Sequence, residues 1–86
     1  MTVYRVLLER AVEKELVHLS SDIHDRVIAA IQALATNPRP SGCRKLAGRT
    51  NDWRIRVGDY RVVYDIADEI RAVRVNRVRH RREVYR

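Results

Sequence analysis

Apolar residues in the first part of the chain recur at two different spacings. Thr2 to Leu8 is short and rich in residues that favour strands, which predicts a first strand. From Glu9 to Leu19, and again from Ile23 to Leu34, apolar residues recur every three or four positions, which predicts two helices. Ser20 offers a capping oxygen to the second helix, and Pro38 stops it. We therefore expect an antiparallel helical hairpin.

Apolar residues alternate with arginines through much of the stretch WRIRVGDYRVVY, residues 53–64. Gly58 and Asp59 divide it into two strands, and glycine at the first turn position is typical of a type II′ hairpin. This turn places Arg56 opposite Arg61. One face of the ribbon is then apolar, and the other carries three cations, Arg54, Arg56 and Arg61. Like charges opposite each other cost a few tenths to about 1 kcal/mol, so we expect an anion to compensate.

The remaining segments complete the order of elements. Residues 39–52 are rich in Pro, Gly, Ser, Asn and Asp, as loops are, and residues 67–69 predict a turn. Ile70 to Val78 predicts a fourth strand. The order β-α-α-β-β-β predicts an α+β fold, in which a small twisted antiparallel sheet carries an N-terminal α-hairpin on one face. We expect one domain over residues 1–86. The helices can cover only the apolar face, so the arginine face is expected to be open.

The charge is concentrated in the second half of the chain. The 86 residues carry a net charge of +7, and residues 39–86 have 14 Lys and Arg against 6 Asp and Glu, a net +8. Such a surface suits a polyanion or an acidic protein. Cys43 is the single cysteine, which excludes an internal disulfide and indicates neither a metal cluster nor a cofactor. No apolar run is long enough to span a membrane, and the first residues are too polar for a signal peptide. We expect a soluble, cytoplasmic protein.

Three motifs carry a family resemblance. KLAG at residues 45–48, WRIRVGDYRVVY at 53–64 and VRHRREVY at 78–85 occur in an order that resembles the RelE side of the RelE/ParE toxin superfamily. The resemblance covers essentially the whole chain. It implies a RelE-like mRNA interferase toxin of a type II toxin–antitoxin system, which is a ribosome-dependent endoribonuclease. Such a toxin cuts mRNA in the ribosomal A site and so inhibits translation.

The resemblance also implies site residues. Matched by position, the catalytic residues of the family fall on Arg54, Arg56, Arg61, Arg81 and Tyr85. The best-known members have lysine at the first two of these positions. A lysine can be tuned toward a neutral base, whereas an arginine, with a pKa above about 12, cannot. Further basic residues are expected to contact RNA or the ribosome: Arg44, Lys45, Arg74, Arg77, Arg79 and His80.

Metal-independent RNA cleavage requires a 2′-hydroxyl to attack its own phosphodiester, leaving a 2′,3′-cyclic phosphate and a 5′-hydroxyl. Arg56 and Arg61 can stabilise the charge that develops on phosphorus, and Arg81 can neutralise the leaving 5′-oxygen. Tyr85 can stack on a base or bond near the 2′-hydroxyl. The general base stays open among three residues, Tyr85, His80 and Glu83. If the last strand continues past Val78, alternation puts His80 on the face opposite the arginines.

Two other function classes remain alternatives. A ParE-like member of the superfamily would bind DNA gyrase, and a non-catalytic module would bind RNA or protein through its basic face. The partners expected for a RelE-like interferase are a cognate RelB-like antitoxin, which would lie across the basic face, the ribosome and its mRNA. Operator DNA is expected to be bound only indirectly, through the antitoxin, and no membrane is expected as a partner.

Overall fold

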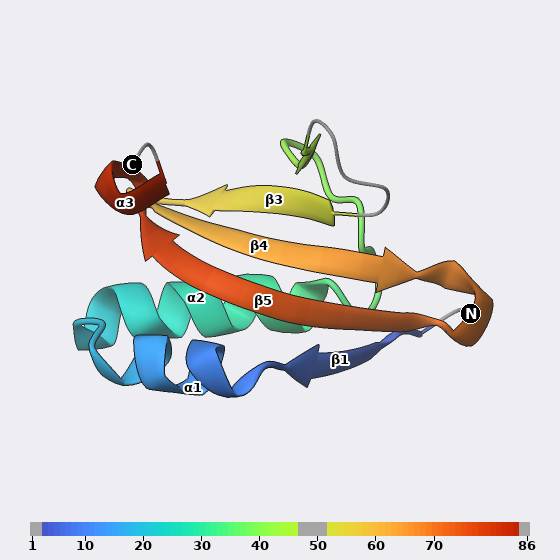
Figure 1. Ribbon diagram of the computed structural model, residues 1–86, viewed down its shortest axis with the longest axis horizontal. Coiled ribbons are helices and arrows are strands. Elements are labelled where there is room, and N and C mark those ends of the chain that lie inside the picture. Colours follow the sequence, from blue (N-terminus) through green and yellow to red (C-terminus); the bar gives the residue numbers. More distant parts are fainter. Residues whose placement is uncertain (1–2, 47–51, 85–86) are drawn as a thin grey trace.

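The structure, a computed structural model, describes residues 3–46 and 52–84, and for residues 83 and 84 it describes the backbone alone. Five strands form one sheet in the order β1-β5-β4-β3-β2, and helices α1 and α2 pack against one face of it (Figure 1). The elements are β1 Arg5–Leu8, α1 Arg10–Val17, α2 Ser21–Ala33, β2 Arg44–Lys45, β3 Asp52–Val57, β4 Tyr60–Ala67, a 3₁₀ turn Asp68–Ile70, β5 Ala72–His80 and α3 Arg81–Val84.

The predicted α+β fold and its β-α-α-β-β-β order are confirmed, with two additions and one difference in strand direction. The additions are the two-residue strand β2, inside the predicted connector, and the terminal helix α3. β1 pairs with β5 in parallel, whereas the other neighbouring strands are antiparallel, so the sheet is mixed. Alternation along a strand does not reveal the direction of its partner, which here lies at the other end of the chain.

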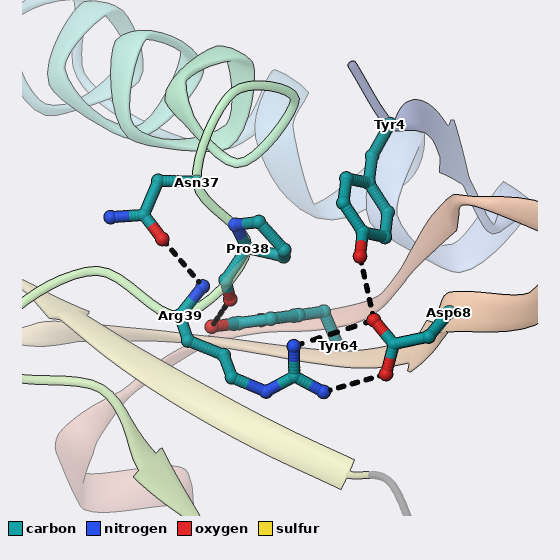
Figure 2. Close-up of polar contacts among 6 residues, drawn as sticks. All are labelled: Tyr4, Asn37, Pro38, Arg39, Tyr64 and Asp68. Carbon is teal, nitrogen blue, oxygen red and sulfur yellow. Dashed lines mark hydrogen bonds and ion pairs between the residues drawn. The ribbon is translucent and has the colours of Figure 1, made fainter. Parts of the chain in front are cut away.

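The core lies between the two helices and the sheet. Each helix contributes one apolar stripe, and each central strand contributes the residues of its inward face. The largest fully buried side chain is Tyr64, whose hydroxyl donates a hydrogen bond of 2.7 Å to the carbonyl of Pro38 (Figure 2). Burial raises the pKa of this hydroxyl well above its usual value. Tyr64 therefore ties the connector after α2 to the centre of the sheet.

The predicted hairpin is confirmed in register. Arg56 pairs with Arg61, and Val57 pairs with Tyr60. Gly58 has a φ of 59°, and Arg71 is the sole residue other than glycine with a positive φ in the described part of the chain. A positive φ at the first turn position alone is the signature of a type II′ turn.

A β-bulge at Asn76 changes the phase of β5. Tyr64 pairs with Val75, but its neighbour Val63 pairs with Arg77, so Asn76 is the extra residue. Val75 and Val78 are therefore both buried on the helix face, although they lie three positions apart. The bulge also brings the basic residues on both of its sides to the other face of the sheet, namely Arg74, Arg77 and Arg79.

A polar cluster closes the end of the sheet at which β1 begins. The Tyr4 hydroxyl donates to Asp68 at 2.6 Å, and the Arg39 guanidinium donates to the same carboxylate at 2.8 Å (Figure 2). Hydrogen bonds from Arg39 and Tyr4 hold the pKa of the Asp68 carboxyl below its usual value. Arg39 also lies over the ring of Trp53, 5.2 Å from its centroid. The cluster links β1, the connector after α2, and the turn between β4 and β5.

Within the described ranges, no helix is long and apolar enough to cross a membrane. The same residues contain no group of His, Cys, Asp and Glu side chains that could hold a metal ion.

Candidate functional site

Four arginines line a hollow at one end of the sheet. At this end α3 lies beside the β3–β4 turn (Figure 1). The hollow has a volume of about 330 Å³ and is lined by Arg56, Gly58, Asp59, Arg61, Arg81 and Arg82. The hairpin brings Arg56 and Arg61 together, because they are paired across its two strands. The backbone N–H of Arg81 donates to the carbonyl of Asp59 at 2.7 Å, which attaches α3 to the turn. Residues distant in sequence thus share one small basic surface.

Arg61 is buried, and in this respect the expected open arginine face is wrong. Its relative exposure is 6 %, and no other charged side chain in the described ranges is buried. Arg61 lies on the central strand β4, with Arg56 beside it on β3 and Arg79 beside it on β5. It lines the hollow together with Arg81 and Arg82 of α3. Because a guanidinium keeps its proton at physiological pH, the floor of the hollow carries a permanent, largely desolvated positive charge. Such a site favours an anion.

The basic residues of β5 are paired with carboxylates, so the face is not uniformly positive. Glu15 of α1 lies 3.6 Å from Arg77 and 3.4 Å from Nε of Arg79, and its other oxygen accepts the backbone N–H of Val78 at 2.8 Å. Arg74 lies between two further carboxylates, Asp65 at 3.1 Å and Glu9 at 3.4 Å. By contrast, Asp59 is the only carboxylate among the described residues that line the hollow. The arginines of β5 are therefore paired with carboxylates, whereas the described lining of the hollow holds more arginines than carboxylates.

The remaining basic residues lie farther along the sheet. Arg44 and Arg54 line a second hollow of about 530 Å³, which lies between α2 and β3 and which Arg56 also borders. Arg56 therefore connects the two hollows. Lys45 is directed elsewhere, since its ammonium lies 6.0 Å from the centroid of the Trp53 ring. Tyr85 and the side chain of Glu83 lie outside the described residues.

His80 faces the helices and not the arginine hollow. β5 continues through His80, so the alternation argument against it applies. Its ring meets that of Tyr60 edge to face, with centroids 5.2 Å apart, and it lines a separate hollow of about 260 Å³ with Glu15 and His18. Its Nδ1 accepts the backbone N–H of Arg82 at 3.3 Å. The ring is thus attached to α3 from the other side of the sheet.

Arg82 and Asp59 line the hollow without having been predicted from the sequence. At α3 the side-chain period changes from two residues to 3.6, so Arg81 and Arg82 can both face the same hollow although they are adjacent. Alternation along a strand could not reveal this. The sequence signal available was the hairpin itself, because any residue of a tight turn lies at the end of the two strands that it joins.

Comparisons with known proteins match this chain over almost its whole length. The family model for the ParE toxin of type II toxin–antitoxin systems, parDE, matches residues 6–85. A chain in the crystal structure of the archaeal RelE–RelB complex from Pyrococcus horikoshii OT3 is similar, at 29% identity and a TM-score of 0.83, covering 94% of this chain and 97% of that chain. A chain of the RelBE2 toxin–antitoxin complex from Mycobacterium tuberculosis has 27% identity and a TM-score of 0.82, covering 93% of each. The isolated E. coli RelE toxin has 28% identity and a TM-score of 0.79, covering 95% of this chain and 90% of that chain. No curated protein sequence matches.

Proposed function

The chain belongs to the ParE toxin family of type II toxin–antitoxin systems, and from that premise we propose that it is a ribosome-dependent endoribonuclease of the RelE kind. The observation that carries the proposal is the hollow in which Arg56, Arg61, Arg81 and Arg82 converge. The solved structures to which the chain is similar include RelE toxins, both isolated and in complexes with RelB. The proposed substrate is the mRNA in the ribosomal A site, and the proposed outcome is arrest of translation.

In the proposed reaction, the 2′-oxygen of a ribose forms a bond to the adjacent phosphorus, and the bond from phosphorus to the 5′-oxygen breaks. The 2′-hydroxyl proton leaves to a base, and a proton is delivered to the 5′-oxygen. Arg56 and Arg61 stabilise the negative charge on the non-bridging oxygens, and Arg81 neutralises the leaving oxygen. Removing one such donor from a desolvated site costs about 100-fold or more in rate. Arg54, at the neighbouring hollow, binds the RNA backbone beside the reacting phosphate.

Proton transfer is the part of this chemistry that the arginines cannot supply. A guanidinium does not give up its proton, so it cannot serve as the base. Among the described residues of the hollow, Asp59 has the only side chain that can accept a proton. Tyr85 and Glu83 remain candidates. A site that stabilises charge well and accepts protons poorly depends on exact alignment of its substrate, so we propose that the ribosome provides this alignment and that free RNA is cut slowly.

The proposed partner that controls the site is a RelB-like antitoxin. Two of the similar structures are toxin–antitoxin complexes with RelB or of the RelBE type. The net +8 of residues 39–86 favours association with an acidic segment. An antitoxin that covers the four arginines would exclude RNA and would raise the stability of this small chain by mass action.

Purified protein should be incubated with ribosomes carrying a reporter mRNA, and the mRNA then analysed by primer extension. Discrete cuts within translated codons, with cyclic phosphate at the 3′ ends, support the proposal. The family match itself names ParE, so a parallel gyrase supercoiling assay tests the second candidate. Inhibition of gyrase without mRNA cleavage would replace the proposed nuclease by a gyrase-binding toxin. Inactivity in both assays, with RNA or protein binding retained, would leave a non-catalytic binding module.

A further inference from the structure

The short helix α3 carries two of the four arginines of the hollow, and among the described residues two backbone hydrogen bonds attach it to the sheet. It spans Arg81–Val84, about one turn, and so short a helix is unstable alone. The first backbone N–H groups of any helix have no partner inside it. Here two of them attach the helix to the sheet: Arg81 donates to the Asp59 carbonyl at 2.7 Å, and Arg82 donates to Nδ1 of His80 at 3.3 Å. The position of α3 therefore depends on its cap.

His80 occupies the position of that cap. It is the last residue of β5, it directly precedes α3, and its side-chain acceptor bonds the second N–H of the helix, as capping residues do. Because Nδ1 accepts this bond, the neutral ring carries its proton on Nε2. Tyr60, its cross-strand partner on β4, meets the ring at an interplanar angle of 86°. The Tyr60 ring thus contacts the imidazole on the helix face of the sheet, while Nδ1 of the imidazole accepts a hydrogen bond from α3.

We infer that His80 is a positioning residue, whose imidazole fixes the start of α3 and thereby places the guanidinium groups of Arg81 and Arg82 at the hollow. His80 does not touch the RNA in this arrangement, since its ring lies on the opposite face with Glu15 and His18. The ligand of the hollow, single-stranded RNA, rests on the proposed function, whereas the cap itself rests on the contacts of His80. The inference assigns a role to a histidine that lies on the face of the sheet opposite the arginine hollow.

Two substitutions separate capping from other roles of the ring. Asparagine carries an oxygen at the same branch position as Nδ1 and is among the best capping residues, so His80→Asn should keep α3 in place. His80→Ala removes the acceptor. The matched control is His18→Ala, because His18 lines the same hollow as His80 and has no hydrogen bond to α3 among the residues described.

Each variant should be measured in three ways: amide hydrogen exchange of Arg82, affinity for a short single-stranded RNA whose 2′-hydroxyls are methylated to prevent cleavage, and single-turnover cleavage of ribosome-bound mRNA. In His80→Ala we expect Arg82 to exchange about tenfold faster, as loss of a cap implies. RNA affinity should fall several-fold, and the cleavage rate should fall at saturating ribosome with little change in half-saturation. His80→Asn and His18→Ala should stay close to the native protein.

Unchanged exchange and unchanged RNA affinity in His80→Ala would overturn the inference. So would a His80→Asn variant that loses RNA affinity while Arg82 stays protected, because the ring would then contact RNA itself. If the native protein cuts no ribosome-bound mRNA, the proposed function fails separately. In that case, loss of Arg82 protection and RNA affinity in His80→Ala, with recovery in His80→Asn, still supports the role of His80.

Discussion

At one end of the sheet, the carboxylate of Asp68 receives hydrogen bonds from both Tyr4 and Arg39. At the other end, four arginines line a hollow in which Asp59 is the one carboxylate among the described residues. Both ends join segments that are distant in sequence, and both contain arginine. The first end pairs its arginine with a carboxylate, whereas the described lining of the second holds four arginines and one carboxylate. Of these two ends, the second is therefore the place to expect an anionic ligand.

The contrast would be tested most strongly by removing the buried cation without removing its volume. Arg61→Met relieves repulsion with Arg56 and Arg79 and fills a similar volume with an apolar side chain, so the melting temperature should change little. Cleavage of ribosome-bound mRNA should fall by roughly 100-fold or more. Melting temperature and single-turnover rate should be measured on the same preparation.

Arg10→Met serves as the control for this change, since Arg10 is an exposed residue of α1, and it should alter neither quantity. Arg61→Lys keeps the charge and should retain part of the activity. Full cleavage by Arg61→Met would show that the hollow is not the active site.

The next largest effect should come from the end of the sheet that holds Arg39 and Asp68, and it should be an effect on stability alone. Trp53 packs against the core and lies beneath the Arg39 guanidinium. Trp53→Ala should lower the free energy of unfolding by about 3 kcal/mol, measured by urea denaturation. Activity per folded molecule should persist. A loss of activity without a loss of folded protein would contradict the division of roles between the two ends.

A smaller effect should appear in the pH dependence of stability. The pKa of Asp68 is lower in the folded protein than in the unfolded chain, so its contribution is complete above the ordinary carboxyl pKa of about 4 and is lost as the pH falls through the folded value. Asp68→Asn should therefore lower the melting temperature at neutral pH, and the two curves should converge in acid. Glu69→Gln, a change at the exposed neighbouring residue, should leave the curve unchanged. Parallel curves for Asp68→Asn and the native protein would argue against this account.

The smallest expected effect is on RNA affinity, and it should come from Glu15, the carboxylate beside two arginines of β5. Glu15→Gln removes the charge that lies beside Arg77 and Arg79, while its amide oxygen can still accept the Val78 N–H. Because exposed ion pairs contribute less than about 1 kcal/mol, RNA affinity should rise only about twofold, with a steeper dependence on salt. Binding titrations at several salt concentrations measure this. Weaker RNA binding would indicate that Glu15 orients the arginines and does not merely neutralise them.

The sequence predicted those features that depend on neighbouring residues. The hairpin register follows from the Gly58-Asp59 turn, and that register alone places Arg56 beside Arg61. The parallel pairing of β1 with β5 and the two-residue β2 depend on partners distant along the chain, so no local pattern contained them. The burial of Arg61 was not predicted, because it depends on the place of β4 between β3 and β5, which the hairpin alone does not reveal.

The residues of the site also fall into two groups, those that were predicted from the sequence and those that were not. Arg56, Arg61 and Arg81 were singled out from the resemblance, and the fold brings them to one hollow, although their catalytic roles stay predictions. Arg82 and the capping contact of His80 arise where β5 ends and α3 begins. A change from strand to helix within a basic tail has no clear signature in the order of its residues.

The bulge at Asn76 has a consequence for sequence alignment and for library design. The side chain of Asn76 makes one contact of 3.3 Å with Asp65, so substitutions at this position should be well tolerated. Deleting the residue should also be compatible with the strand. Arg77 would then follow Val75 directly, and regular alternation would keep Val78 toward the helices and Arg77 and Arg79 on the other face. A relative that lacks the bulge therefore needs a gap at this position, and an alignment that omits the gap assigns the basic residues that follow to the wrong face.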